Sequence, residues 1–110
     1  MARARGAIVT HPAQRLDDTV HQRVRLGVLA VLAEVRRADF AYLRDALELT
    51  DGNLSRHIAV LEQAGLVEVE KGFEGRRSRT WVQATADGRR ALKAEMQALR
   101  ELISRVDAGH

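Results

Sequence analysis

Polar side chains cluster within the run LTDGNLSRHIAVLEQAGLV, which spans positions 49–67: Asn53, Ser55, Arg56 and His57. Asparagine can form two hydrogen bonds with adenine, arginine can do the same with guanine, and serine can bond a base or a phosphate. On a rigid helix these residues could therefore read the edges of base pairs in DNA. Two alternatives remain open. The residues could form an ordinary solvated helix face, and His57, which borders the aliphatic side, could be a structural histidine.

The same run contains the residue types of a catalytic triad but cannot assemble one. Asp51, Ser55 and His57 lie too close together on one helix to act as orienter, nucleophile and base. The rest of the sequence shows no paired acids, nucleophile elbow or phosphate-binding loop. Cysteine is absent, and the histidines and aspartates between positions 11 and 21 are best explained as surface residues. We therefore expect no enzyme activity, no metal and no cofactor.

A helix over about residues 51–64 would position the polar cluster. Thr50 and Asp51 offer side-chain oxygens that can cap its first turn. Its opposite side carries aliphatic residues at helical spacing: Leu54, Ile58 and Leu61. Gly65 should end the helix, because glycine readily adopts the positive φ found just beyond a last turn. The polar cluster is then expected to point away from the core.

After this helix the period of the sequence changes to two, which is typical of β-strands. Valines and glutamates alternate in LVEVEKGF, a basic segment GFEGRRSR follows, and TWVQA alternates again. These features predict a hairpin over about residues 67–84 with a basic tip formed by Lys71, Arg76, Arg77 and Arg79. Such a tip could follow the phosphate backbone or enter the minor groove. It could instead be a solubilising loop, or its arginines could pair with Glu68 or Glu70.

A long helix is expected over about residues 85–106, beginning at Thr85. Aliphatic residues and methionine recur on it at steps of four and three: Leu92, Met96, Leu99, Ile103 and Val106. This seam is too long for a hairpin and three short helices to cover. We therefore expect a homodimer in which two such helices meet.

The sequence before residue 50 predicts an arm and two helices. Residues 1–15 lack an aliphatic period, so we expect a flexible basic arm whose Arg3 and Arg5 could add a minor-groove contact. Asp17 and Asp18 could cap the start of a helix that is aliphatic almost all round and closes with basic residues at 36 and 37. A short break, ADF, and the amphipathic stretch AYLRDALEL complete this part.

The composition fits one small DNA-associated domain. The chain has 110 residues and a net charge of +3, and lysine occurs only at positions 71 and 93, so most basic residues are arginines. Arginine suits phosphate and guanine edges, although genome base composition can also enrich it. No aliphatic run is long enough to span a membrane, and the absence of cysteine fits a reducing compartment. We expect a cytoplasmic protein with no membrane partner.

Several motifs in the correct order resemble the ArsR-like and MarR-like winged-helix regulators. NLSRHIAVLEQAGLVEV resembles their second helix-turn-helix helix, VHQRVRLGVLAVL their first core helix, and FEGRRSRTWVQATADGRRAL their wing and the start of their dimer helix. The likeness is strongest to short, stand-alone winged-helix regulators. It does not extend to metal sensing, because the cysteines are missing and the last helix has no histidine before His110. A small-molecule effector of unknown chemistry remains compatible with the resemblance.

The sequence thus predicts a mainly α fold with a small β-hairpin, namely a winged helix-turn-helix with a long C-terminal dimerisation helix. The domain should span residues 16–110. We expect a homodimer that binds double-stranded DNA at an inverted repeat, with the recognition helix in the major groove and the wing on the backbone or in the minor groove. The alternative is a winged-helix module that binds other proteins without specific DNA binding.

Overall fold

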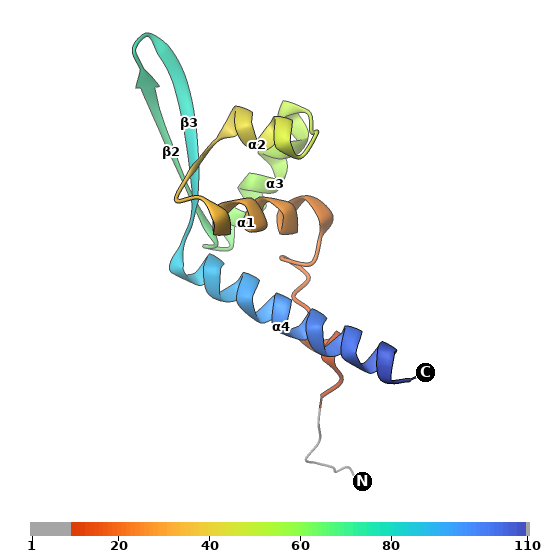
Figure 1. Ribbon diagram of the computed structural model, residues 1–110. Coiled ribbons are helices and arrows are strands. Elements are labelled where there is room, and N and C mark those ends of the chain that lie inside the picture. Colours follow the sequence, from red (N-terminus) through yellow and green to blue (C-terminus); the bar gives the residue numbers. More distant parts are fainter. Residues whose placement is uncertain (1–9, 110) are drawn as a thin grey trace.

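The computed structural model describes residues 10–109, and Figure 1 shows their arrangement. The elements follow in the order η2 (Pro12–Arg15, a 3₁₀ helix), α1 (Arg23–Glu34), β1 (Ala38–Asp39), α2 (Phe40–Ala46), α3 (Asp51–Gln63), β2 (Val67–Glu74), β3 (Arg77–Ala84) and α4 (Ala86–Ala108). The strands form an antiparallel sheet in the order β1-β3-β2. This is a winged-helix fold of the α+β class, as the sequence predicted.

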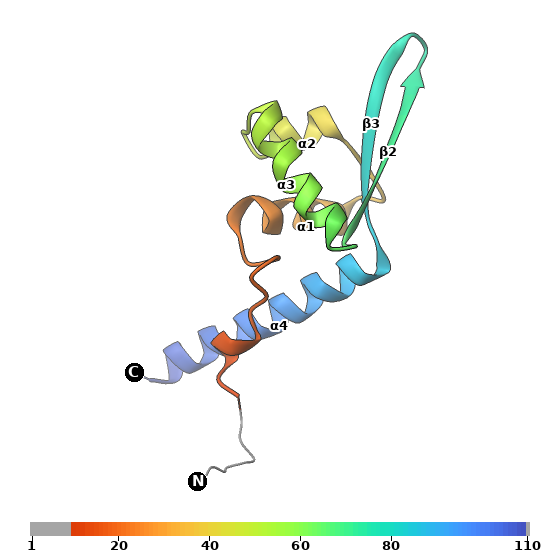
Figure 2. The ribbon, with the colours of Figure 1, turned by 180° about the vertical axis from the view of Figure 1, so that it is seen from behind.

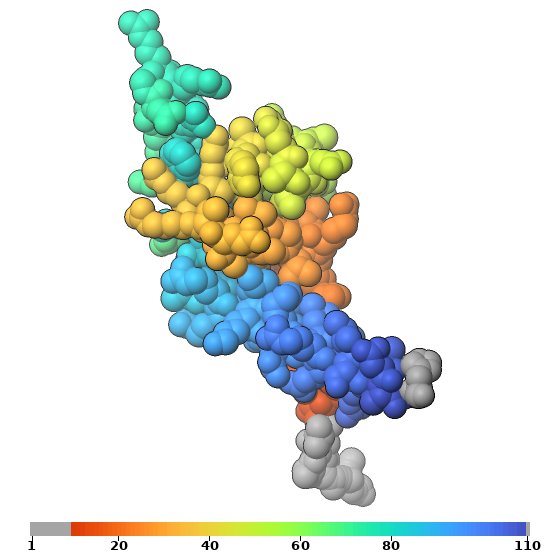
Figure 3. All heavy atoms as spheres, viewed as in Figure 1, coloured from red at the N-terminus to blue at the C-terminus, as the bar shows by residue number. Residues whose placement is uncertain are grey.

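The molecule is elongated, with extents of 64 × 27 × 23 Å. Helices α1, α2 and α3 gather beside the base of the hairpin, and α4 crosses beneath them (Figures 1 and 2). The hairpin of β2 and β3, hereafter the wing, projects beyond this body at one end, while α4 forms the opposite end (Figure 3). The core is aliphatic, and its fully enclosed residues include Val28, Leu43, Leu54, Leu61 and Val82.

Helix α1 begins later than the sequence analysis expected. Its N-cap is Gln22, whose side-chain oxygen accepts hydrogen bonds from the backbone N–H groups of Val24 and Arg25. The prediction that Asp17 or Asp18 caps this helix is therefore wrong. Asp17 instead holds a separate turn, because its Oδ1 accepts a 2.8 Å hydrogen bond from the Thr19 N–H. Val20 precedes the helix but is buried, so it continued the aliphatic period of α1 and suggested an earlier start of the helix.

The short break before α2 is a strand. Ala38 and Asp39 pair with Val82 and Trp81 of β3, so the sheet has a third strand in addition to the expected hairpin. Asp39 also caps α2 by accepting a hydrogen bond from the Ala41 N–H. Two residues are too few to show a period of two, which explains why the pattern did not reveal this strand.

The predicted turns around α3 and in the wing are confirmed. Thr50 caps α3 by accepting from the Asn53 N–H at 3.1 Å, and Gly65 follows the helix with φ of 78°. The wing turn is the dipeptide Gly75–Arg76, since Glu74 pairs with Arg77. Gly75 has φ of 64°, as a glycine at the first central position of a two-residue hairpin turn requires.

The segment before α1 packs on the body from Pro12 onward, which differs from the flexible arm expected over residues 1–15. Pro12 in η2 is buried, and the Arg15 guanidinium pairs with the Glu101 carboxylate of α4. This segment therefore covers part of α4 that was expected to need a partner. Arg3 and Arg5, the proposed minor-groove contacts of the arm, lie outside the described residues.

Helix α4 is attached to the base of the wing by a close crossing. Thr85 caps it by accepting from the Gly88 N–H at 2.9 Å, and the Thr85 hydroxyl donates to the Gly65 carbonyl at 2.7 Å. Gly88 packs so tightly against the backbone of Leu66 that an added Cβ would lie 2.0 Å from the Leu66 carbonyl oxygen. A residue with a side chain cannot occupy this position without moving the backbone.

Candidate nucleic-acid interface

Helix α3 presents the predicted readers at its surface. Leu54, Ile58 and Leu61 are all at most 5% exposed, so this side of the helix is fixed in the core. Ser55 and Arg56 are exposed, and Asn53 is partly exposed. The Arg56 guanidinium donates a 2.6 Å hydrogen bond to Asn53 Oδ1 one turn away. The two longest predicted readers thus lie together on the free edge of α3 and support each other there.

The acidic first turn of α3 is paired with an arginine of the preceding helix. Arg44 of α2 contacts Asp51 at 2.9 Å and Asp45 at the same distance. Hydrogen bonds to Asp45 and then Asp51 raise the pKa of Arg44 further above its ordinary value. One guanidinium shared by two carboxylates reduces the negative charge at the N-terminus of α3, and the pairing joins the two helices of the helix-turn-helix.

His57 lies on the inner side of α3, only 9% exposed. Its Nδ1 accepts a 3.1 Å hydrogen bond from the Arg25 guanidinium of α1. Burial lowers the pKa of His57, and the positive charges of Arg25, Arg56 and Arg23 lower it further. Of the two roles left open for this residue, the geometry therefore favours the structural one, because its ring cannot reach a base edge from the core.

The basic tip of the wing divides into free and paired residues. Lys71, Arg76 and Arg77 are exposed. Arg79 is instead tied down, since its guanidinium pairs with Asp39 of β1 and, at 2.8 Å, with Glu74. The sequence analysis had allowed pairing with Glu68 or Glu70, but these acids contact Gln83 at 3.0 Å and Arg37 at 3.6 Å. Arg79 therefore braces the outer half of the wing against β1.

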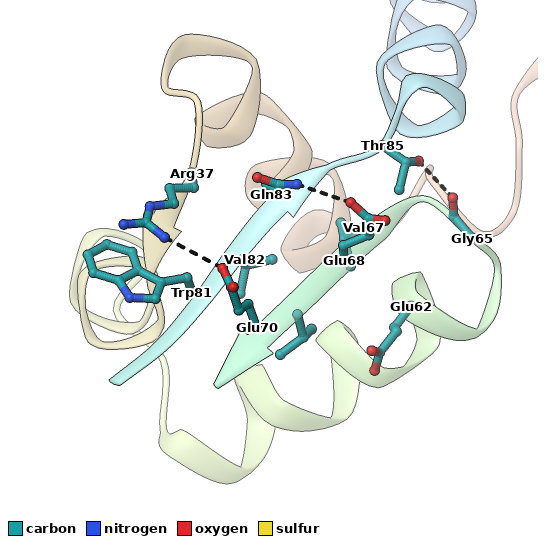
Figure 4. Close-up of a pocket in the computed structure, with 11 residues that line it drawn as sticks. Arg37, Glu62, Gly65, Val67, Glu68, Glu70, Trp81, Val82, Gln83 and Thr85 are labelled. Carbon is teal, nitrogen blue, oxygen red and sulfur yellow. Dashed lines mark hydrogen bonds and ion pairs between the residues drawn. The ribbon is translucent and has the colours of Figure 1, made fainter. Parts of the chain in front are cut away.

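A pocket at the base of the wing is acidic, as its close-up shows (Figure 4). This pocket of about 700 Å³ is lined by carboxylates of Glu62, Glu68 and Glu70. Its one guanidinium, from Arg37, stacks on the Trp81 ring at 4.1 Å from the centroid. Three carboxylates against one guanidinium disfavour phosphate in this pocket, whereas the opposite, inner face of the wing adjoins α3.

That inner face of the wing carries a residue that the sequence analysis missed. Phe73 is 79% exposed, more than any other large hydrophobic side chain among the described residues. It follows Lys71 on the same face of β2, and its register partner is Ser78. A groove at the foot of this face lies between the wing and α3, and its polar lining consists of Ser55, Glu62, Lys71 and Thr80. The period of two already predicted that Phe73 lies on this face. It did not predict that this part of the wing extends past the core and leaves Phe73 exposed.

Helix α4 has one side buried in its own chain and an adjacent side left free. Gly88, Glu95 and Ala98 face the body. The predicted seam occupies the adjacent side: Leu92, Met96 and Leu99 are partly buried, while Ile103 and Val106 are each 58% exposed. Leu92 packs against the chain's own core, so its role in a dimer contact is smaller than the sequence pattern implied.

Two other classes of site find no support within residues 10–109. No three histidine, cysteine, aspartate or glutamate side chains are grouped there so that they could hold a metal ion. No helix in this range combines the length and apolar character needed to cross a bilayer.

A helix-turn-helix followed by a basic hairpin defines a winged-helix, nucleic-acid-binding class of protein. Comparison with known proteins agrees, since the family model "Winged helix DNA-binding domain" matches residues 24–103. The chain belongs to this family. It is therefore a DNA-binding protein rather than an enzyme, and the resemblance to winged-helix regulators is confirmed at the level of the family.

Individual relatives support the same assignment. The chain is 36% identical over 84 residues to an uncharacterized protein of Methanocaldococcus jannaschii, covering 76% of this chain and 91% of the relative. A transcriptional regulator homologue from Pyrococcus horikoshii is 37% identical with a TM-score of 0.77, covering 81% of this chain and 88% of that one. The M. tuberculosis transcriptional regulator MosR, solved with DNA, shares the fold at 23% identity and a TM-score of 0.67, covering 90% and 71%.

Proposed function

We propose that this protein is a transcriptional regulator that binds a specific double-stranded DNA operator as a homodimer. The observation that carries the proposal is the placement of two different free surfaces. Helix α3 and the tip of the wing lie toward one side of the molecule and α4 lies at the other (Figure 1). The free edge of α3 is polar and the tip of the wing is basic, whereas the free edge of α4 is aliphatic. The Pyrococcus horikoshii relative supports the regulatory role.

The N-terminal half of α3 enters the major groove. Asn53, Ser55 and Arg56 contact base edges or phosphates, and Gly52 and Ala59, which are small and exposed, allow the helix to approach closely. Arg56 is the strongest candidate for guanine recognition because it is exposed and only another side chain of the same edge holds it. His57 lies on the buried side of α3 and is not among these contacts.

The wing supplies contacts that do not depend on base sequence. Lys71, on the face that adjoins α3, and Arg76 and Arg77, at the turn, are free to bind phosphates or to enter the minor groove. Phe73 lies between these cations and adds an apolar contact with the groove. Arg79 holds the wing at its angle through Asp39 and Glu74 instead of contacting DNA.

The dimer forms through the free side of α4. Met96, Leu99, Ile103 and Val106 would lose their exposure against the same residues of a second copy, as a two-fold axis requires. Two recognition helices on one face of DNA would then lie about 34 Å apart. The operator is accordingly an inverted repeat with half-site centres roughly 10 base pairs apart.

Selection of bound sequences from a random duplex pool tests this proposal. We expect enrichment of an inverted repeat, a stoichiometry of two chains per site, and affinity that falls steeply with salt as phosphate contacts release counterions. Fluorescence anisotropy with a scrambled duplex of equal length provides the control. If no sequence is enriched and the two duplexes bind equally, specific operator recognition is refuted and a protein-interaction module becomes the better explanation.

A further inference from the structure

Arg25 of α1 joins the turn just before its own helix to α3, which is distant in sequence. Its Nε donates a 2.6 Å hydrogen bond to the Thr19 carbonyl, and one terminal nitrogen lies 3.4 Å from the Asp18 carbonyl. The other terminal nitrogen donates to His57 Nδ1 of α3 at 3.1 Å. Few side chains other than arginine present donors in this planar fork. Arg25 thus connects the turn at residues 17–21 with the inner side of α3.

The same turn is fixed at its other end by α4. Glu95 is 1% exposed, and its Oε1 accepts a 2.9 Å hydrogen bond from the Asp17 N–H. Its Oε2 lies 2.7 Å from His21 Nδ1. Unbroken polar contacts therefore run from Glu95 of α4 through the turn at residues 17–21 and Arg25 to His57. We call this path the strap.

The strap imposes a protonation state on His57. A guanidinium can only donate, so Nδ1 of His57 must hold a free lone pair and the ring must be uncharged. The charged groups that face His57 are Arg25 and Arg23 of α1 and Arg56 of its own helix. The turn at residues 17–21 offers Arg25 backbone carbonyls, while the carboxylate of Asp17 stays with the turn and His21 faces Glu95.

We propose that Arg25 is the positioning residue for the recognition helix and that the strap holds α3 in its reading position only while His57 is uncharged. A proton on Nδ1 would place donor against donor and a fourth positive charge beside three guanidiniums. In this proposal α3 shifts to relieve the repulsion, which moves Arg56, the adjacent residue, away from its base. This inference rests on the proposed function, because operator affinity is its main readout.

The direction of the pH dependence follows from the environment of His57. Its pKa in the folded protein lies below the ordinary value of about 6.5, since burial and then the neighbouring arginines disfavour the charged ring. The folded arrangement binds fewer protons than an arrangement in which the ring is released. The strap is therefore fully formed above about pH 6.5 and is lost as pH falls through the lowered pKa.

The test measures affinity for the selected operator between pH 5.5 and 8 by fluorescence anisotropy. For the wild type we expect affinity to fall on acidification, by up to about tenfold per pH unit once His57 begins to protonate. His57→Asn keeps an acceptor near the position of Nδ1 but cannot be charged, so it should bind well at pH 7.5 and lose this fall. His11→Asn is the matched control, because it replaces an exposed N-cap histidine of η2 outside the strap with another good cap and should retain the wild-type profile.

Positioning by Arg25 is tested separately with Arg25→Lys and Arg25→Met. Both should weaken operator binding at pH 7.5 and remove the acid-dependent fall, because neither side chain can join the turn to His57. Affinity that rises on acidification, or a His57→Asn profile identical to the wild type, would overturn the inference. A double-mutant cycle of Arg25 and His57 on the urea midpoint of the free protein gives an independent readout. If no DNA is bound but this coupling disappears at low pH, the proposed function fails and the strap stands. If DNA is bound and the coupling is absent, the strap fails alone.

Discussion

Helices α3 and α4 each bury one side in their own chain and leave another side free, but the free sides differ in chemistry. On α3 the free side carries Ser55, Arg56 and small residues, and its aliphatic side is closed within the core. On α4 the free side carries Ile103 and Val106, while a glutamate, Glu95, is buried on the side that faces the body. The free side of α3 is therefore polar, whereas the free side of α4 is apolar and its buried side includes a carboxylate.

This difference indicates which kind of partner each helix contacts outside its own chain. A polar edge beside a basic wing suits the hydrogen-bonding edges and phosphates of DNA. An aliphatic edge at the far end of the molecule suits another protein surface, and a second copy of α4 offers the same residues in return. Substitutions at the crossing that joins the two helices, and on each free side separately, test these assignments.

The largest effect is expected from Gly88→Ala, which changes the crossing between α4 and the chain that leaves α3. The new Cβ would lie 2.0 Å from the Leu66 carbonyl oxygen, so the backbone must move. We expect a loss of about 3 kcal/mol in the free energy of unfolding, measured by urea denaturation. Gly52→Ala is the control, because its new Cβ would meet no neighbouring side chain or element within 4 Å and a helical alanine should stabilise slightly. If the two variants were equally stable, Gly88 would not pack closely against the backbone of Leu66.

The next effect concerns the free side of α4. Leu99→Asp combined with Ile103→Asp places charge where two copies should meet, and we expect self-association to weaken by at least about 100-fold. Sedimentation equilibrium measures the change, and circular dichroism checks that the fold remains. Ala94→Asp adds an acid at another exposed position of the same helix and should remain dimeric. A dimer that survives the double substitution would mean that the seam lies elsewhere.

The sequence was sufficient to predict the bounds of α3 and of the wing, because the residues that determine them lie close together in the chain. Thr50 and Gly65 mark the ends of α3, and the change of period after Gly65 marks the wing. Contacts between distant residues gave no such signal. The pairing of Arg79 with Asp39 and that of Arg25 with His57 depend on how β1, α1 and α3 pack together. The predicted start of α1 was wrong because aspartate is a favoured N-cap residue and glutamine is not, so only the packed structure identifies Gln22 as the cap.

The seam on α4 illustrates the same limit. Its period correctly identified an aliphatic side, but period alone does not say which part of that side the chain itself covers. Leu92 proves to pack against the core, and η2 lies along α4 through Arg15 and Glu101. The part of the seam that remains free, from Met96 onward, could be located only after the N-terminal segment had been placed.

A smaller effect is expected from Arg56, on the free side of α3. Arg56→Ala should cost about 1–3 kcal/mol in operator binding and relax the preference at one base position of each half-site. Arg56→Lys retains the positive charge but not the fork, so it should lose the base preference while keeping the salt dependence. Anisotropy titrations against operators that vary at each position would measure both. Unchanged operator affinity in Arg56→Ala would show that another surface reads the sequence.

The smallest effect separates the two kinds of arginine in the wing. Arg77→Ala should weaken binding to all duplexes about equally and reduce the slope of log affinity against log salt by about 1, because one phosphate contact is lost. Arg79→Ala should instead lower the urea midpoint, since Asp39 and Glu74 lose their shared partner. If Arg77→Ala changed sequence preference and left the salt slope intact, the wing would be reading bases. Base recognition would then extend from α3 to the tip of the wing, and the wing would not be limited to phosphate contacts.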